Sequence, residues 1–199
     1  MFGLPEETEV SKFISKNAIY TKFNFTNAQK TSFDEDIKKI SIIHEISDNT
    51  LHLPGSDENS FFILKIQLKR KNYDSKNIEK LYKLIDRNLL LAITYEDEVC
   101  FAVFKTVLHQ SEWQKVEDVK LTLNGHDYET IWENMVRLCG GLELNTSKAL
   151  EEQIEEKVEN ENILKQVALL ESKLKKEKQP NKKFALFEEI KKLKSELEG

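Results

Sequence analysis

Apolar and polar residues alternate most regularly in the stretch FFILKIQLKRK, residues 61–71. In an extended strand, successive side chains project to opposite faces. The apolar set is Leu64, Ile66 and Leu68, and the polar set is Lys65, Gln67 and Lys69. The pattern therefore predicts a strand with one buried and one polar face. The polar row is either solvated surface or the edge of a nuclease-type active site.

The same analysis predicts the other elements of residues 1–145. Strands are expected at 39–47, 89–95 and 99–108, with an edge strand at 118–125. Helices are expected at 26–40, 74–86 and 127–141, and a weak helix at 11–23. These elements predict one α+β (or α/β) domain of about five strands flanked by helices.

From residue 146 onward the composition changes to Glu, Lys, Leu, Ile, Gln and Ala, so we expect a domain boundary between residues 145 and 146. Apolar residues then recur at the four-three-four spacing of a coiled-coil seam: Ile163, Val167, Leu170 and Leu174. Pro180 interrupts the pattern. A second helical stripe follows at Phe184, Phe187, Ile190, Leu193 and Leu197. Residues 146–199 thus predict an antiparallel helical hairpin, a short coiled coil.

A hairpin of two helices is marginal by itself, because ordering each residue costs about 1–2 kcal/mol of backbone entropy. We therefore expect its apolar seam to be shared with another protein, another copy of the chain, or the chain's own αβ domain. The expected partner-binding residues are Ile163, Val167, Leu170, Leu174, Phe184, Phe187, Ile190 and Leu193.

Composition and charge narrow the functional classes. The net charge of −5 argues against a stand-alone nucleic-acid binder. Cys100 and Cys139 have neither metal-ligand nor redox spacing, which favours a reduced, cytoplasmic setting. We expect no signal peptide and no membrane span, because no apolar run approaches about 18–20 residues. The four scattered histidines predict no metal site, and no cofactor is expected.

The polar row of residues 61–71 carries the candidate chemistry. Restriction-type nucleases place an acidic residue or Gln, one spacer and a Lys on a strand, and Gln67 and Lys69 resemble that pattern. Such a site uses Mg²⁺ and needs a carboxylate, for which we name Glu45, with Asp48, Asp57 and Glu58 also available. The predicted catalytic set under this reading is Gln67, Lys69 and Glu45.

The surroundings of this strand allow two further readings. A local basic patch for nucleic-acid phosphates would consist of Lys65, Lys69, Arg70 and Lys71. Trp113 either anchors a partner or caps the core of its own domain. Cys139 lies on the apolar side of a predicted helix and is expected to serve packing.

Four phrases carry a resemblance over essentially the whole chain: MFGLPEETEV, IQLKRKNYDSKNIEKL, IWENMV, and KKEKQPNKKFALFEEIKKLKSEL. Together they resemble the bacterial domain-of-unknown-function family 4391. The family has no established activity, so the resemblance implies no catalytic residues. It implies a partner class, since members are often encoded beside helicases and DNA methyltransferases of restriction-modification or phage-defence character.

Three functions follow as hypotheses. The first is a non-enzymatic accessory subunit of such a complex, with any DNA contact indirect. The second is a Mg²⁺-dependent or degenerate nuclease. The third is a structural protein that forms homo-oligomers through its C-terminal helices.

Overall fold

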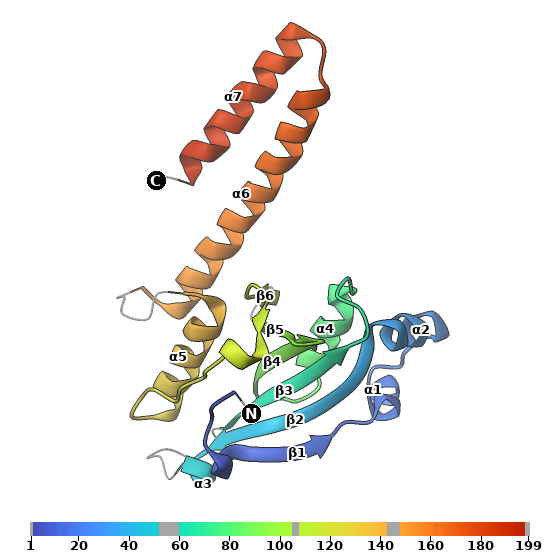
Figure 1. Cartoon of the computed structure of the whole chain (residues 1–199), viewed down its shortest axis with the longest axis vertical. Helices are drawn as coiled ribbons and strands as arrows, with labels where there is room; N and C mark the ends of the chain where they lie inside the picture. Colours follow the sequence, from blue (N-terminus) through green and yellow to red (C-terminus); the bar gives the residue numbers. More distant parts are fainter. Residues whose placement is uncertain (1, 52–59, 105–107, 143–147, 198–199) are drawn as a thin grey trace. The chain divides into compact units, whose positions relative to one another are not determined.

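The computed structural model describes residues 2–51, 60–104, 108–142 and 148–197 (Figure 1). The chain divides into two compact units, residues 1–146 and 147–199, one residue from the predicted boundary. Within the described ranges, no helix is both long and apolar enough to cross a membrane.

The first unit is built on one mixed sheet. The described strands are β1 (Glu9–Phe13), β2 (Ile37–Ser47), β3 (Ser60–Leu68), β4 (Asn88–Tyr95), β5 (Glu98–Phe104), β6 (Leu108–Gln110) and β7 (Gln114–Lys115). The order is β1-β2-β3-β4-β5-β6, with β7 also paired to β5. Only β3 and β4 are parallel neighbours among these strands. A parallel pair requires a crossover, which α4 (Ser75–Tyr82) supplies.

The other helices of this unit are mostly short. They are η1 (Glu6–Thr8), α1 (Lys16–Lys22), α2 (Asn27–Asp36), α3 (Asp48–Leu51), η2 (Val116–Asp118) and α5 (Tyr128–Gly140). Of these, α2 and α5 begin at a side-chain cap. The carboxylate of Asp127 accepts a hydrogen bond from the Thr130 N–H at 2.8 Å and begins α5. Gly141 ends that helix in the left-handed conformation, with φ of 60°.

The two faces of the sheet are covered differently. One face packs against α1, α2 and α4, and its buried residues include Leu64, Ile66 and Leu68 of β3. On the other face, Phe61 contacts the rings of Tyr128 and Trp132 in α5, with centroids 5.9 and 5.1 Å away. Figure 1 shows α5 near the end of the sheet where β3 begins, and α1 and α2 near the opposite end.

The sequence predicted the fold class correctly, and the differences lie in the elements. The described sheet has seven strands rather than about five. The weak helix expected at 11–23 is instead the end of β1 followed by α1. The edge strand expected at 118–125 is absent: Val119 and Leu121 are buried, and the Leu121 N–H donates to the Phe2 carbonyl at 2.8 Å. Apolar alternation there reflects burial of a loop, not pairing in the sheet.

The second unit is a helical hairpin of α6 (Leu150–Lys176) and α7 (Pro180–Glu196), with Pro180 in the first turn of α7. The two helices pack together, and the Lys194 ammonium lies 2.8 Å from the Glu171 carboxylate. Val167 and Ile190 are buried. Half-buried apolar residues continue their seam: Ile163, Leu170, Leu174, Leu186, Leu193 and Leu197.

Candidate functional site

A polar hollow lies on the sheet face that carries Lys65 and Gln67. Its volume is about 260 Å³, and it is lined by Ser11, Phe13, Lys39, Ser41, Ile43, Lys65 and Gln67 of β1, β2 and β3. The register explains this grouping, because Lys39 pairs with Gln67 and Ser41 pairs with Lys65. Cross-strand partners share a face, so the polar row of β3 meets a second polar row on β2.

The hollow is cationic. It contains two lysines, and none of its described lining residues is acidic. Burial, and then the neighbouring Lys39, lower the pKa of the Lys65 ammonium below its ordinary value. The Lys39 ammonium also lies 5.9 Å from the centroid of the Phe13 ring. This arrangement suits an anion better than a divalent cation, which needs oxygen ligands of negative charge.

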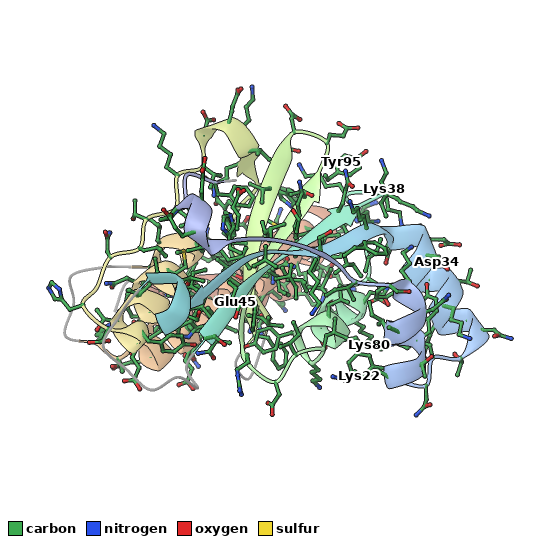
Figure 2. All side chains as sticks on the ribbon, turned by 90° about the horizontal axis from the view of Figure 1, so that it is seen from below. Lys22, Asp34, Lys38, Glu45, Lys80 and Tyr95 are labelled. Atoms are coloured by element: carbon green, nitrogen blue, oxygen red, sulfur yellow. The ribbon has the colours of Figure 1, made fainter. Side chains whose placement is uncertain are left out.

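Glu45, the carboxylate predicted for a nuclease site, does not reach the hollow. It pairs with Phe62, which projects to the opposite face of β3 from Gln67. The cause is an irregularity between Ile42 and His44, where the extra residue of a β-bulge reverses the alternation of β2. Gln67 pairs with Lys39 and Thr94. Figure 2 labels the next residues along these strands, Lys38 and Tyr95, and shows Glu45 well away from both.

Lys69 is separated from Gln67 as well. It lies one residue beyond β3, and its N–H donates to the Asp36 carbonyl at 2.8 Å. Burial acts to raise the pKa of the Asp34 carboxyl, but hydrogen bonds from Lys16 and Tyr20, with weaker attraction from Lys16 and Lys69, lower it. Lys69 is therefore placed towards α2. The described structure does not bring Gln67, Lys69 and Glu45 together, and the Asp48 side chain, Asp57 and Glu58 lie outside the described residues.

In the described ranges, no group of three His, Cys, Asp or Glu side chains is placed to hold a metal ion. His44 is fully buried, with its Nδ1 atom 2.9 Å from the Thr8 hydroxyl. Burial raises the pKa of the Cys100 thiol to about 12 and raises that of Cys139 as well. Both thiols are protonated at neutral pH and serve packing.

The predicted phosphate-binding residues have different surroundings. The Arg70 Nε donates to the buried Asp36 carboxylate at 2.6 Å. The Lys71 ammonium lies 2.6 Å from the Glu98 carboxylate and 4.9 Å from the centroid of the Trp113 ring. Trp113 is half-buried against the main core, so it caps its own domain. Of the four basic residues, only Lys65 lines the hollow.

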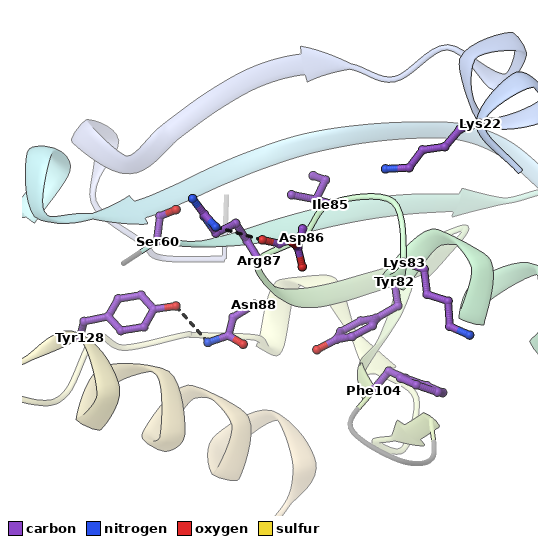
Figure 3. Close-up of a pocket in the computed structure, with 10 residues that line it drawn as sticks. All are labelled: Lys22, Ser60, Tyr82, Lys83, Ile85, Asp86, Arg87, Asn88, Phe104 and Tyr128. Atoms are coloured by element: carbon purple, nitrogen blue, oxygen red, sulfur yellow. Dashed lines mark hydrogen bonds between the residues drawn. The ribbon is translucent and has the colours of Figure 1, made fainter. Parts of the chain in front are cut away.

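A larger pocket, of about 740 Å³, was not predicted from the sequence (Figure 3). It is lined by Lys22, Ser60, Tyr82, Lys83, Ile85, Asp86, Arg87, Asn88, Phe104 and Tyr128. These residues come from α1, α4, α5, the starts of β3 and β4, the end of β5, and the segment between α4 and β4, which carries Lys83, Ile85, Asp86 and Arg87. No motif links them, since only the fold brings them together. The one available signal was the cluster Lys83, Asp86 and Arg87 before a buried strand.

The hairpin leaves part of its apolar surface outside the seam. Among the eight predicted partner-binding residues, Phe184 and Phe187 are 67% and 54% exposed. The other six are buried or half-buried. Leu164 and Leu169 of α6 are also exposed, at 55% and 63%. These two leucines are not among the residues predicted to bind a partner.

Comparisons with known proteins agree with the resemblance in the sequence. Residues 2–197 match the family described as Domain of unknown function (DUF4391). Neither the comparison with curated proteins nor the comparison with solved structures gave a match. Because the match spans nearly the whole chain, from the β-sheet unit through the helical hairpin, the chain belongs to this family of domains of unknown function.

Proposed function

We propose that this protein is a non-enzymatic accessory subunit that assembles with a larger protein through the outer face of its C-terminal hairpin. The observation that carries the proposal is the exposure of Phe184 and Phe187 after the hairpin seam has formed. The partner class is a helicase or DNA methyltransferase of a restriction-modification or phage-defence system, as the family resemblance implies.

The two phenylalanines have the properties of interface anchors. They are three residues apart on α7, so they lie on neighbouring positions of the same helix surface. Large aromatic side chains carry much of the binding energy at protein interfaces, and a folded protein gains nothing by exposing two of them to water. This pair therefore supports contact with a partner.

The charges beside the anchors favour an acidic partner surface. Lysines predominate around the turn between α6 and α7: Lys173, Lys175, Lys176, Lys178, Lys182 and Lys183. Glu177 is the one acidic residue in this stretch. Such a polarised rim accelerates association with a surface of opposite charge and disfavours partners of like charge.

The sheet hollow supports a secondary role for the αβ unit. Lys39 and Lys65 with Ser11, Ser41 and Gln67 provide donors for an anionic group such as a backbone phosphate. The overall charge of −5 opposes tight binding of DNA by the free protein. We therefore assign any DNA contact to the assembled complex, in which a partner supplies most of the affinity.

The test is affinity purification of the tagged full-length chain from its native cells, followed by mass spectrometry. We expect a helicase or DNA methyltransferase with the wild-type chain, and its loss from the double variant Phe184→Ser/Phe187→Ser. The control is Leu138→Ser, which removes an apolar side chain that is 39% exposed from the αβ unit. Retention of the partner by the double variant, or its absence from the wild-type sample, would overturn the proposal.

Sedimentation of the purified chain separates this function from self-association. A hetero-assembly subunit is expected to sediment at its own mass of 23.3 kDa. A stable homo-oligomer that the same double substitution disperses would assign the exposed phenylalanines to a second copy of the chain.

A further inference from the structure

The pocket in Figure 3 holds a surplus of positive charge. Lys22, Lys83 and Arg87 line it together with a single carboxylate, Asp86. Within the described residues none of the three cations forms an ion pair. The Lys22 ammonium donates to the Leu84 carbonyl, and the Arg87 Nη1 donates to the Asp86 carbonyl at 3.2 Å. The Lys83 ammonium lies 5.8 Å from the centroid of the Phe104 ring.

These contacts leave the cations available for a ligand. An ammonium carries three N–H donors and a guanidinium five, so one hydrogen bond to a carbonyl does not exhaust either group. The carbonyl contacts also restrain Lys22 and Arg87 beside the pocket. Lys22, Lys83 and Arg87 are exposed, and none of them has a carboxylate partner among the described residues. Together they give the pocket a net attraction for an anion.

One end of the pocket is aromatic. The rings of Tyr82 and Phe104 lie with centroids 5.4 Å apart and planes inclined by 46°, and Ile85 adds apolar surface. Figure 3 shows these two rings facing the same space, with Lys83 beside them. Such surfaces accept a planar ring by stacking, a contact worth about 1–3 kcal/mol for a nucleic-acid base.

The other end of the pocket is polar. The Asn88 Nδ2 donates to the Tyr128 hydroxyl at 3.0 Å, and the Ser60 hydroxyl lies at the same end (Figure 3). Burial raises the pKa of the Tyr128 hydroxyl, whereas its bond with Asn88 and the charge of Arg87 act to lower it. Arg87 is therefore within electrostatic range of this polar end, and Figure 3 shows its side chain extending toward Ser60.

We infer that this pocket binds a nucleoside phosphate, with its phosphate at Arg87 and its base against Tyr82 and Phe104. Arginine and lysine are the usual cationic donors to phosphate oxygens. The volume of about 740 Å³ lies within the range of about 300–1,000 Å³ typical of small-molecule sites, and it exceeds what a phosphate ion alone would fill. The site is independent of the hairpin and of the proposed assembly function.

Isothermal titration of the full-length protein tests this site with AMP, ATP, adenosine and inorganic phosphate in the absence of divalent cations. We expect the nucleotides to bind more tightly than either adenosine or phosphate. A 5′-phosphorylated single-stranded oligonucleotide distinguishes a free nucleotide from the end of a nucleic acid. Binding of the oligonucleotide alone would overturn the free nucleotide as the ligand.

Three variants connect the affinity to this pocket. Arg87→Gln removes a charge at nearly constant size and is expected to weaken nucleotide binding at least about tenfold. Phe104→Leu keeps apolar bulk and should weaken nucleotides more than phosphate. The third variant is the control: Lys38→Gln changes an exposed residue at the start of β2 and should leave binding unchanged.

Circular dichroism melts of each variant separate lost binding from lost folding. Three results would overturn the inference: no nucleotide binding at millimolar concentration, equal affinity for phosphate and nucleotide, or unchanged affinity in a folded Arg87→Gln variant.

Discussion

At the scale of single residues, Asp36 is the most constrained polar group of the αβ unit. Its side chain is buried, and its carboxylate accepts hydrogen bonds from the Arg70 Nε at 2.6 Å and from the Asp74 N–H and the Asn77 Nδ2, both at 2.9 Å. These bonds join the end of α2 to the turn after β3 and to the start of α4. The basic run after β3 is thus partly structural, which its charge alone does not indicate.

Replacing this carboxylate should destabilise the fold. Asp36→Asn turns one acceptor into a donor facing other donors, so we expect the free energy of unfolding to fall by about 2–3 kcal/mol. The control is Asp34→Asn, two residues earlier, where the carboxylate is 51% exposed beside Lys16. That change should cost less than about 1 kcal/mol. Urea unfolding at neutral pH measures both, and equal losses would contradict the assignment.

The same network predicts a pH dependence. Burial acts to raise the pKa of Asp36, but the hydrogen bonds from Asp74, Asn77 and Arg70 outweigh it and lower the pKa below 3.8. A carboxyl group with a lowered folded-state pKa stabilises the protein above its unfolded pKa, and that stabilisation is lost as pH falls through the folded value. Asp36→Asn should therefore flatten the loss of stability below pH 3.8. A slope identical to the wild type would exclude Asp36 as a cause.

The sheet hollow leads to a second prediction for individual residues. Because its described lining contains lysines and no carboxylate, we expect no cleavage of duplex DNA with Mg²⁺ or Mn²⁺, with or without the captured partner. If the captured helicase or methyltransferase cleaves DNA, that activity should persist when the partner is assembled with the Lys69→Ala variant of this chain. Gel analysis of plasmid substrates measures this. Metal-dependent cleavage that Lys69→Ala abolishes would restore the nuclease reading.

The alternation in β3 predicted which of its side chains share a face, but not which residues of β2 lie beside them. Strict alternation would place Glu45 on the same face as Lys39 and Ser41, since all three have odd positions. The β-bulge between Ile42 and His44 moves Glu45 to the opposite face. A bulge depends on pairing with a distant strand, so the local pattern does not reveal it.

At the scale of elements, α7 shows how helical spacing selects the seam. The predicted stripe of α7 has a spacing of three residues: Phe184, Phe187, Ile190 and Leu193. Each step of three residues turns the helix by about 300°, which is less than a full turn. The stripe therefore drifts around the helix. Leu186, Ile190, Leu193 and Leu197 repeat at four, three and four, which keeps them on one side. The stripe predicted from the sequence thus starts with the two exposed phenylalanines, whereas the seam within the hairpin starts at Leu186.

Two substitutions in adjacent residues should separate seam from surface. Leu186→Ala removes a half-buried seam residue and is expected to destabilise the hairpin by about 1–2 kcal/mol. Phe187→Ala removes a side chain that is 54% exposed and should change hairpin stability by less than about 0.5 kcal/mol. Amide hydrogen exchange over residues 150–196 measures the protection of both helices. A larger loss of protection in Phe187→Ala would reverse the assignment.

At the scale of the whole molecule, the change of composition after residue 145 predicted two parts, and the structure has two compact units, residues 1–146 and 147–199. The main core belongs entirely to the αβ unit, since the buried residues of this cluster all lie between Ile19 and Ala102. The pocket of Figure 3 was not predictable in the same way. Its lining residues are scattered from Lys22 to Tyr128, and their chemistry arises only when six elements and the segment between α4 and β4 meet.

This division predicts that stability and assembly are separable. A fragment of residues 1–146 contains the whole main core and should unfold cooperatively, with a melting temperature within a few degrees of the full chain. The same fragment should lose the helicase or methyltransferase partner, because it lacks Phe184 and Phe187, yet keep nucleotide binding at Arg87. Circular dichroism, affinity purification and titration measure the three properties on one sample. A folded fragment that still captures the partner would place the docking surface on the αβ unit instead of the hairpin.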